Sequence, residues 1–362
     1  MKGDVASILA KPPSSGGGGG RIRAIDWLRG IAVFDMILWH SAGLLKPGHS
    51  REILGLLGGL VAPAFLFAAG YAIALVVVRA SASPDPAARR RRAVKSLQRI
   101  GEVLVVALIL RWLTRSSYDP HWIYAIDILN AIALTLLAVF PIMYAGGKRP
   151  GLTAVIVALL GLGCFAVAPH VPDGFWGDFI KPGSSDFAPI PWSGYVLIGA
   201  AAGCLASMNL TGAALSGLFF LGCLLKFTPW SAFVGGNAWI LTNHGERFLM
   251  VFGTALALYS LEREANERGW KLDWFPFSAL ELVGTSALTA YTVHIVLLYV
   301  PIPNPVYHFS YWRVWGQKLD WGPYFLALLS LFGITMLVCW GWPKVSEAVK
   351  ARLPWNRGKA GA

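Results

Sequence analysis

Residues 24–40, AIDWLRGIAVFDMILWH, are mostly the run of Ile, Val, Leu, Met and Trp that is typical of a membrane-spanning helix. The stretch nevertheless carries Asp26, Arg29, Asp35 and His40. An ionisable side chain at the centre of a bilayer costs about 2.5–3.5 kcal/mol unless it finds a partner or water. We therefore expect a transmembrane helix whose polar side chains are retained for a function.

The composition of the 362-residue chain predicts an integral membrane protein. Hydrophobic residues make up 56% and charged residues only 14%, with a mean hydropathy of +0.56, whereas about a quarter of a soluble domain is charged. The 16 Trp residues fit the same class, because indole rings favour the headgroup boundary. The net charge is +12, and the basic residues that produce it lie in short loops between apolar runs. This pattern orients membrane proteins and argues against a nucleic-acid partner.

Apolar runs long enough to cross the lipid bilayer, at roughly 20 residues each, predict the fold class. It is all-α, a polytopic membrane helix bundle of about ten transmembrane helices. The runs lie near residues 26–45, 53–79, 100–114, 122–145, 151–169, 190–208, 211–226, 247–262, 278–301 and 323–343. The third and seventh runs are short, which leaves the count open by one or two.

Three regions follow from this pattern. Residues 1–22, with the run PPSSGGGGG, are expected to be a disordered cytoplasmic segment. Residues 23–345 form the predicted transmembrane domain, and 346–362 a basic cytoplasmic tail. The four Cys lie in apolar stretches without a CxxC pair, so we expect buried small residues and neither disulfides nor a metal site.

The distribution of Lys and Arg predicts the orientation. With ten helices, the basic N-terminal segment, the basic loop over 80–99, Lys148, Arg149 and the C-terminal tail all fall on one side. The positive-inside rule makes that side cytoplasmic, so both termini are predicted to lie inside. The outer side then receives an acidic loop with Asp173, Asp178 and Asp186.

Arg29 and His40 are expected to share one face of the first helix. Eleven steps of about 100° make three turns plus about 20°, and they separate the two residues by about 16 Å along the axis. Arg29 then lies at the cytoplasmic end of a polar stripe, one turn after Asp26, with which it could pair. Asp35 lies about 140° round from His40 and faces another neighbour.

Each polar residue also has a structural interpretation. Arg29 could extend to the interface and His40 could bond to a neighbouring helix. Deeper in the span, ionisable residues such as Asp35 and His40 more often mark transport pathways or chemistry. Histidine changes charge near neutral pH, which suits it to general-base catalysis.

The segment RIRAIDWLRGIAVFDMILWH, residues 21–40, resembles the opening of two families of transmembrane acyltransferases. The acyltransferase-3 family carries an Arg, ten residues and a His in its first helix. The heparan-α-glucosaminide N-acetyltransferase-like family opens with a similar pattern of Arg, Ile-Asp, Leu-Arg-Gly and Met. Three further stretches are similar to the second, fourth and late helices of the latter: PAFLFAAGYAIAL (63–75), IDILNAIALTLL (126–137) and SALTAYTVHIVLL (286–298), the last being shared by both families.

The resemblance implies transfer of an acyl group, usually acetyl, from cytoplasmic acyl-CoA to a hydroxyl or amine of a sugar or glycan. It makes His40 the catalytic histidine and Arg29 its companion. Animal members of the heparan type instead use a histidine after the first helix. The one histidine in that segment here, His49, does not match in spacing and stays the alternative. No permanently bound cofactor is implied, because acetyl-CoA is a substrate.

Asp127 and Asn130 lie one turn apart within WIYAIDILNAIAL. They either bond to neighbouring helices or bind substrate. NHGER, residues 243–247, is expected to precede the eighth helix on the outer side, either as an ordinary helix start with a solvated charge pair or as a place where Asn243 and Arg247 contact an acceptor sugar. Trp230 and Trp239 could stack on its rings, while His294, on one face with Tyr291, is interpreted as a satisfied interhelical bond.

We therefore predict a membrane-bound O- or N-acyltransferase, multi-pass in a bacterial inner membrane, with the bilayer and acyl-CoA as partners. A proton-coupled secondary transporter that uses Asp35, His40 and Asp127 is the alternative, and a purely structural protein is a third. Transporters often show two related halves, and no internal repeat is visible. The predicted substrate-binding residues are Asp26, Asp35, Asp127, Asn130, Asn243 and Arg247.

Overall fold

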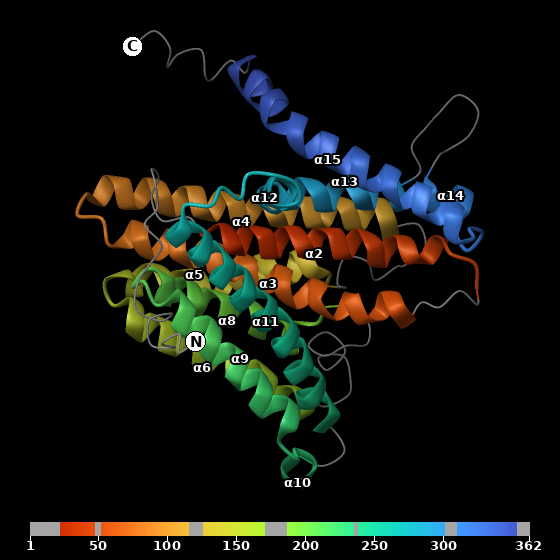
Figure 1. Ribbon diagram of the computed structural model, residues 1–362. Helices are drawn as coiled ribbons and strands as arrows, with labels where there is room; N and C mark the ends of the chain where they lie inside the picture. Colours follow the sequence, from red (N-terminus) through yellow and green to blue (C-terminus); the bar gives the residue numbers. More distant parts are fainter. Residues whose placement is uncertain are drawn as a thin grey trace. The chain divides into compact units, whose positions relative to one another are not determined.

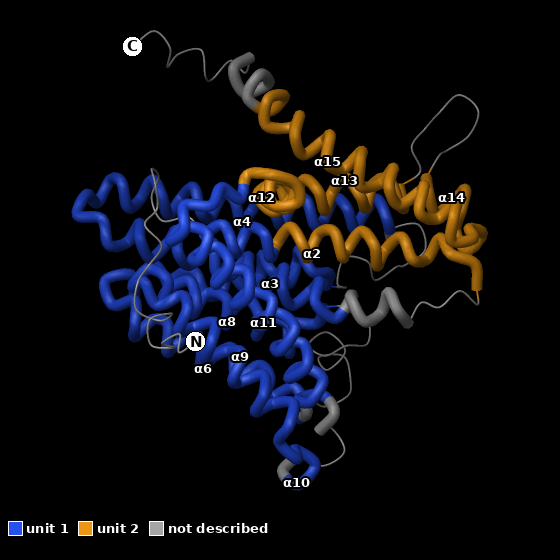
Figure 2. The backbone as a smooth tube through the Cα atoms, in the orientation of Figure 1, with its two compact units in different colours: residues 1–28, 58–272 blue, residues 29–57, 273–362 orange. Residues whose placement is uncertain are grey.

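The computed structural model confirms the all-α class. It describes residues 22–47, 52–115, 126–170, 187–234, 238–300 and 310–352. Their regular elements are helices, apart from an isolated parallel β-bridge between Leu45 and Leu319. The chain divides into two compact units, shown in Figure 2: unit 1 holds residues 1–28 and 58–272, and unit 2 holds 29–57 and 273–362.

Unit 1 is a bundle of long helices labelled in Figure 1. Within it α6 packs on α8, α9 on α11, α4 on α5, and α5 on α8. Its elements are the start of α2 (Arg23–Ser41), most of α3 (Glu52–Ser81), α4 (Pro86–Arg115), α5 (Ile128–Ala145), η2 (Gly146–Lys148), α6 (Pro150–Val167), η3 (Ala168–His170), α8 (Pro189–Ala206), α9 (Thr211–Phe227), α10 (Ser231–Val234) and α11 (Ala238–Arg268).

Unit 2 takes the rest of α2 and the C-terminal helices. Helix α15 packs on α12 and α13, and α14 packs on α13 and η1. The further elements are η1 (Ala42–Leu44), α12 (Phe277–Thr285), α13 (Ala287–Tyr299), α14 (Tyr311–Trp315) and α15 (Trp321–Arg352). The boundary between the units therefore falls inside α2, the helix that carries Arg29 and His40.

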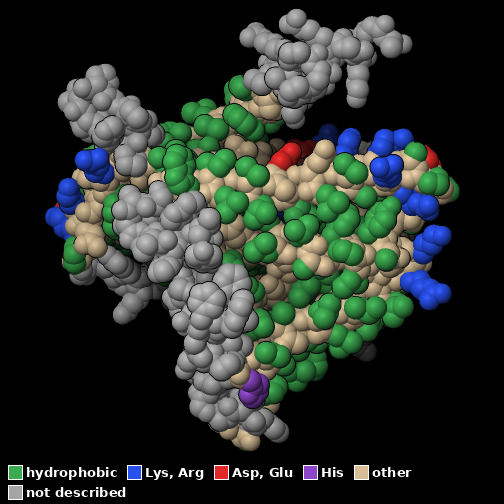
Figure 3. All heavy atoms as spheres, turned by 180° about the vertical axis from the view of Figure 1, so that it is seen from behind, with side chains coloured by type: hydrophobic (Ala, Val, Ile, Leu, Met, Phe, Trp, Pro, Cys, Tyr) green, Lys and Arg blue, Asp and Glu red, His purple; other side chains and the backbone are tan. Residues whose placement is uncertain are grey.

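Five described helices are long and apolar enough to cross a bilayer, and a sixth crossing results if α12 and α13 count as one. Each of the ten expected runs coincides with helix, but a count of ten crossings is not confirmed. Helix α9 has only 17 residues, and α2 has Asp26, Arg29 and Asp35 within its 19. The exposed hydrophobic side chains form a wide field in Figure 3, as expected of a surface that faces lipid.

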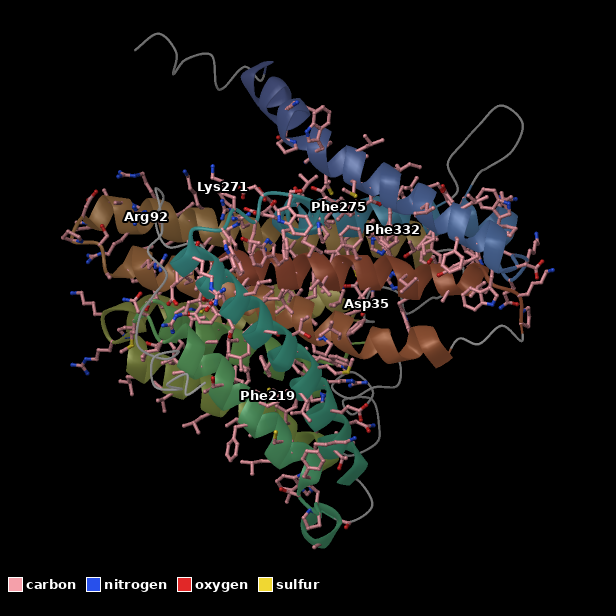
Figure 4. The ribbon with its side chains drawn as sticks, viewed as in Figure 1. Asp35, Arg92, Phe219, Lys271, Phe275 and Phe332 are labelled. Atoms are coloured by element: carbon pink, nitrogen blue, oxygen red, sulfur yellow. The ribbon has the colours of Figure 1, made fainter. Side chains whose placement is uncertain are left out.

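The basic loop predicted over 80–99 is wrong, because most of it is helix. Only a short turn separates α3 from α4, which begins at Pro86. The Asp85 carboxylate accepts a hydrogen bond from the Ala87 N–H at 2.8 Å, and proline is well suited to the first helical position. Ala, Arg and Lys propagate a helix well, so the basic residues stand on its exposed first turns, where Figure 4 labels Arg92.

The single helix expected over 278–301 is broken. Helices α12 and α13 meet at 86° around Ser286. Such breaks leave carbonyl groups at the end of the first helix without helical partners, and proteins keep them in membranes only where other groups satisfy those carbonyls. The break therefore creates a polar position inside unit 2.

Glycines allow α3 and α8 to approach each other closely within unit 1. A Cβ atom added to Gly199 would lie 2.1 Å from the Phe67 carbonyl oxygen, and one added to Gly203 would lie 2.4 Å from the Tyr71 carbonyl oxygen. Gly199 and Gly203 frame the sequence GAAAG, a spacing that favours close packing of membrane helices. The two backbones are in direct contact at these glycines.

Gly199→Ala should therefore destabilise unit 1, because its methyl group would collide with the α3 backbone. Overpacking of this kind costs about 1–3 kcal/mol. The measurement is the temperature at which the detergent-solubilised protein loses its monodisperse size-exclusion peak. Gly163→Ala on α6 is the matched control, since a Cβ there meets nothing within 4 Å. Equal melting of both variants would contradict the close contact.

Candidate functional site

The end of α2 that carries His40 is fixed to the segment before α15. The Gln317 N–H donates to the Gly43 carbonyl and the Leu319 N–H to the Leu44 carbonyl, each at 3.0 Å. Lys46 and Asp320 add an ion pair at 2.6 Å. This short backbone pairing holds the last turn of α2 in place within unit 2.

His40 lies against His294 of α13. Its Nδ1 is 2.9 Å from His294 Nε2, and the two rings are stacked at 5.2 Å with an interplanar angle of 13°. His294 is fully buried, whereas His40 is half-buried. The Tyr299 hydroxyl donates to the His40 carbonyl at 3.4 Å. His294 lies two helical turns after the break at Ser286, and its ring contacts that of His40.

Arg29 lies three turns earlier on α2 and binds the end of α12. Its Nη1 donates to the Gly284 carbonyl at 3.2 Å. Gly284 belongs to the last turn of α12, whose carbonyls lack helical partners and carry the negative end of the helix dipole. The guanidinium thus gives the Gly284 carbonyl at the end of α12 a hydrogen-bond donor. The Arg29 side chain is half-buried.

Asp35, labelled on α2 in Figure 4, is buried with only 8% of its surface exposed. Neither carboxylate oxygen has a hydrogen-bond partner among the described residues. An ionised carboxylate in such surroundings costs several kcal/mol. Asp35 is therefore a buried acid that local packing does not explain.

The first turn of α2 is capped from α11 within unit 1. The Glu262 carboxylate accepts the N–H groups of Arg23 at 3.0 Å and Ala24 at 2.9 Å. These donors lack helical partners at a helix start, and a carboxylate suits the positive end of the dipole. Asp26, in the same turn, is also buried. Sequence reasoning missed Glu262, because it lies 239 residues from Arg23.

Asp127 and Asn130 are brought together with Arg111 of α4. Asp127 caps α5, accepting the Asn130 N–H at 2.9 Å, and its carboxylate lies 3.8 Å from Arg111 Nε. Arg111 is only 2% exposed, and the buried Oδ1 of Asn130 has no hydrogen-bond partner within the described parts of the chain. Asp127 and Asn130 thus have a structural role at the start of α5. Sequence reasoning missed Arg111 because it lies in a predicted apolar run.

The prediction that NHGER precedes a helix is wrong, since α11 starts at Ala238 and runs through it. Asn243 is exposed, and the Arg247 guanidinium lies 5.0 Å from the ring centre of Trp192. His244 between them is buried, with its Nδ1 2.8 Å from the Tyr195 hydroxyl. The Arg247 guanidinium therefore packs against an aromatic cluster of unit 1.

The structure thus groups the predicted residues in two ways. In unit 2, Arg29, Asp35 and His40 lie on one helix with His294 as a partner, and in unit 1 Asp127 and Asn130 lie together. Among the residues that the structure describes, no three His, Cys, Asp or Glu side chains could hold a metal ion. Predictions outside the described residues concern His49, Asp173, Asp178, Asp186, both chain ends and the Trp239 side chain.

Arg29→Ala should destabilise unit 2, because the Gly284 carbonyl would lose a charged donor, a bond worth at most about 1.5–3 kcal/mol. Arg29→Lys retains a charged donor and should lose less stability. Size-exclusion profiles of heated, detergent-solubilised variants measure the effect. Arg92→Ala, at an exposed position of α4, is the control. An Arg29→Ala variant as stable as the control would rule out the capping role.

A family model described as heparan-alpha-glucosaminide N-acetyltransferase, catalytic, matches residues 21–238. The match covers more than half of the chain. It includes Arg29, His40, Asp127 and Asn130, and it ends before Asn243, Arg247 and His294. No curated protein was found to match the chain.

Proposed function

The chain belongs to the family of heparan-α-glucosaminide N-acetyltransferase catalytic domains, and we propose that it transfers an acyl group, acetyl in the first instance, from cytoplasmic acyl-CoA to a hydroxyl or amine of a sugar or glycan. Family membership supports a membrane acetyltransferase and favours it over a secondary transporter. The donor, the acceptor and the side of the membrane belong to the proposal.

The observation that carries the proposal is the environment of His40. A half-buried imidazole near the end of an apolar helix is held through one ring nitrogen at 2.9 Å by a fully buried histidine. An imidazole fixed through one nitrogen can use the other to accept a proton, which is the arrangement of a general base.

The chemistry then follows in one displacement. His40 takes the proton from the acceptor hydroxyl or amine as that atom attacks the thioester carbonyl. The new C–O or C–N bond forms, the C–S bond breaks, and the leaving thiolate takes the proton from the His40 imidazolium, which gives CoA and restores the neutral base. The products are the acylated acceptor and free CoA, and no oxidant or reductant is required. A positioned base typically contributes about 10²–10⁴-fold to such a reaction.

Arg29 is proposed at the donor end of the path. It lies three turns from His40, about 16 Å by helical rise, which the pantetheine arm of CoA can span. Guanidinium groups bind phosphate in a bidentate manner, whereas lysine offers a point charge. Acetyl-CoA affinity, measured on the folded fraction of the Arg29 variants above, tests this role separately from the capping of α12.

The other predicted polar residues are proposed as acceptor contacts separately within each unit, Asp35 in unit 2 and the rest in unit 1. Asp35 offers a buried carboxylate, and Asn130 offers a buried amide oxygen; neither group has a described hydrogen-bond partner. Arg247 with Trp192 offers a cation beside an aromatic face, a combination suited to sugars. Asp26, Asp127 and Asn243 complete the proposed set.

His40→Ala should leave the protein folded and lower acyl transfer by about a hundredfold or more, because no other group replaces the base. Release of CoA from radiolabelled acetyl-CoA by purified protein in lipid nanodiscs provides the measurement. His170→Ala, an exposed histidine in η3, is the matched control. Normal turnover by a folded His40→Ala protein would refute the assignment and transfer attention to His49.

Both termini and the basic start of α4 are proposed to be cytoplasmic, since Lys and Arg gather there. Reporter fusions at residues 92 and 180 should then report opposite sides of a bacterial inner membrane. Two fusions that report the same side would show that the number of crossings between them is even, contrary to the proposed orientation.

A further inference from the structure

His294 makes two hydrogen bonds whose directions are determined by their partners. Its Nδ1 lies 3.0 Å from the Ala290 carbonyl oxygen, one turn earlier on α13. A carbonyl oxygen can only accept a hydrogen bond, so His294 Nδ1 carries a proton. Its Nε2 lies 2.9 Å from His40 Nδ1.

The charge of His294 follows from its burial. The side chain has no exposed surface, and an imidazolium there would cost several kcal/mol of desolvation. The aromatic neighbours are Tyr291, whose ring centre lies 5.4 Å from that of His294 and nearly perpendicular to it, and Tyr299, at 6.2 Å from the His40 ring; neither is a carboxylate that would pair with an imidazolium. His294 is therefore neutral, and its Nε2 is an acceptor.

The 2.9 Å contact then requires the proton to lie on His40 Nδ1. A neutral imidazole carries one N–H, so the basic lone pair of His40 is on Nε2, at the opposite edge of its ring. In water the other tautomer, with the proton on Nε2, competes with this one. The hydrogen bonds from His294 to the Ala290 carbonyl and from His40 to His294 select the Nδ1–H tautomer of His40.

We propose that His294 is a positioning residue that fixes His40 as the Nδ1–H tautomer and thereby directs its Nε2 toward the reaction. This rests on the proposed function, in which His40 is the general base. His294 accepts the Nδ1–H bond throughout, and this bond strengthens when His40 becomes an imidazolium, because hydrogen bonds from charged donors are roughly twice as strong. The nearly parallel rings keep the base in one orientation.

The tautomer itself can be measured on the unmodified protein. Magic-angle-spinning NMR of ¹⁵N-histidine-labelled protein in nanodiscs separates protonated from unprotonated ring nitrogens, and a His40→Gln sample assigns the His40 signals. We expect a protonated Nδ1 and an unprotonated Nε2 for His40. A protonated Nε2 with an unprotonated Nδ1 would overturn the proposal, whatever the activity of the protein.

Three variants test the consequence for turnover. His294→Leu fills a similar volume without an acceptor and should lower kcat by about ten- to a hundredfold, the range found when the hydrogen-bond partner that orients a metal-ligating histidine is removed. KM for acetyl-CoA should change little. His294→Gln places an amide oxygen near the position of Nε2 and should restore most of the turnover. Thr292→Val, at a half-buried residue of α13 whose hydroxyl donates to the Leu288 carbonyl of its own helix, is the matched control.

The outcomes separate this proposal from the proposed function. If His40→Ala is inactive but His294→Leu retains normal kcat with a mixture of His40 tautomers, the base assignment stands and the positioning role fails. If His294→Leu and His294→Gln lose kcat equally while both remain folded, the acceptor role also fails. Rescue by Gln together with a protonated His40 Nδ1 in the wild type supports it.

Discussion

Polar groups inside an apolar bundle must find their partners within the protein, and this constraint governs the arrangement around the first helix. Unpaired donors and acceptors there cost several kcal/mol each. The amides that begin α2 bind Glu262, the Arg29 guanidinium binds the Gly284 carbonyl, and the His40 ring binds His294. These three contacts give partners to polar groups at the start, the middle and the end of α2.

The break between α12 and α13 provides the partners for two of these contacts. An unbroken helix would offer no unsatisfied carbonyl to Arg29. The 86° bend exposes the end of α12 for that contact and sets the direction of α13, on which His294 reaches the ring of His40. Irregular backbone at membrane depth is tolerated where it is buried in protein or lines a water-filled cavity, and the Arg29 contact meets that condition at the end of α12.

The family match and the geometry complement each other. The match ends at residue 238, so it includes the proposed base but not the histidine that holds it. The Asp35 carboxylate in unit 2 and the Asn130 amide oxygen in unit 1 have no hydrogen-bond partner among the described residues. An acyltransferase accounts for a base and for further buried polar groups in one apolar protein.

The sequence by itself determined the all-α class and the positions of the apolar helices, because hydropathy and the 3.6-residue period are local properties. It also paired Arg29 with His40 on one face. It misjudged the basic segment at residues 86–99 and the start of α11, where polar residues continue a helix because capping and propensity outweigh polarity. The partners were decided by the tertiary structure alone. Glu262 lies 239 residues from Arg23, His294 lies 254 from His40, and Arg29 binds a carbonyl 255 residues away. No local pattern encodes such contacts, because they depend on which helix faces pack together and on where a helix breaks.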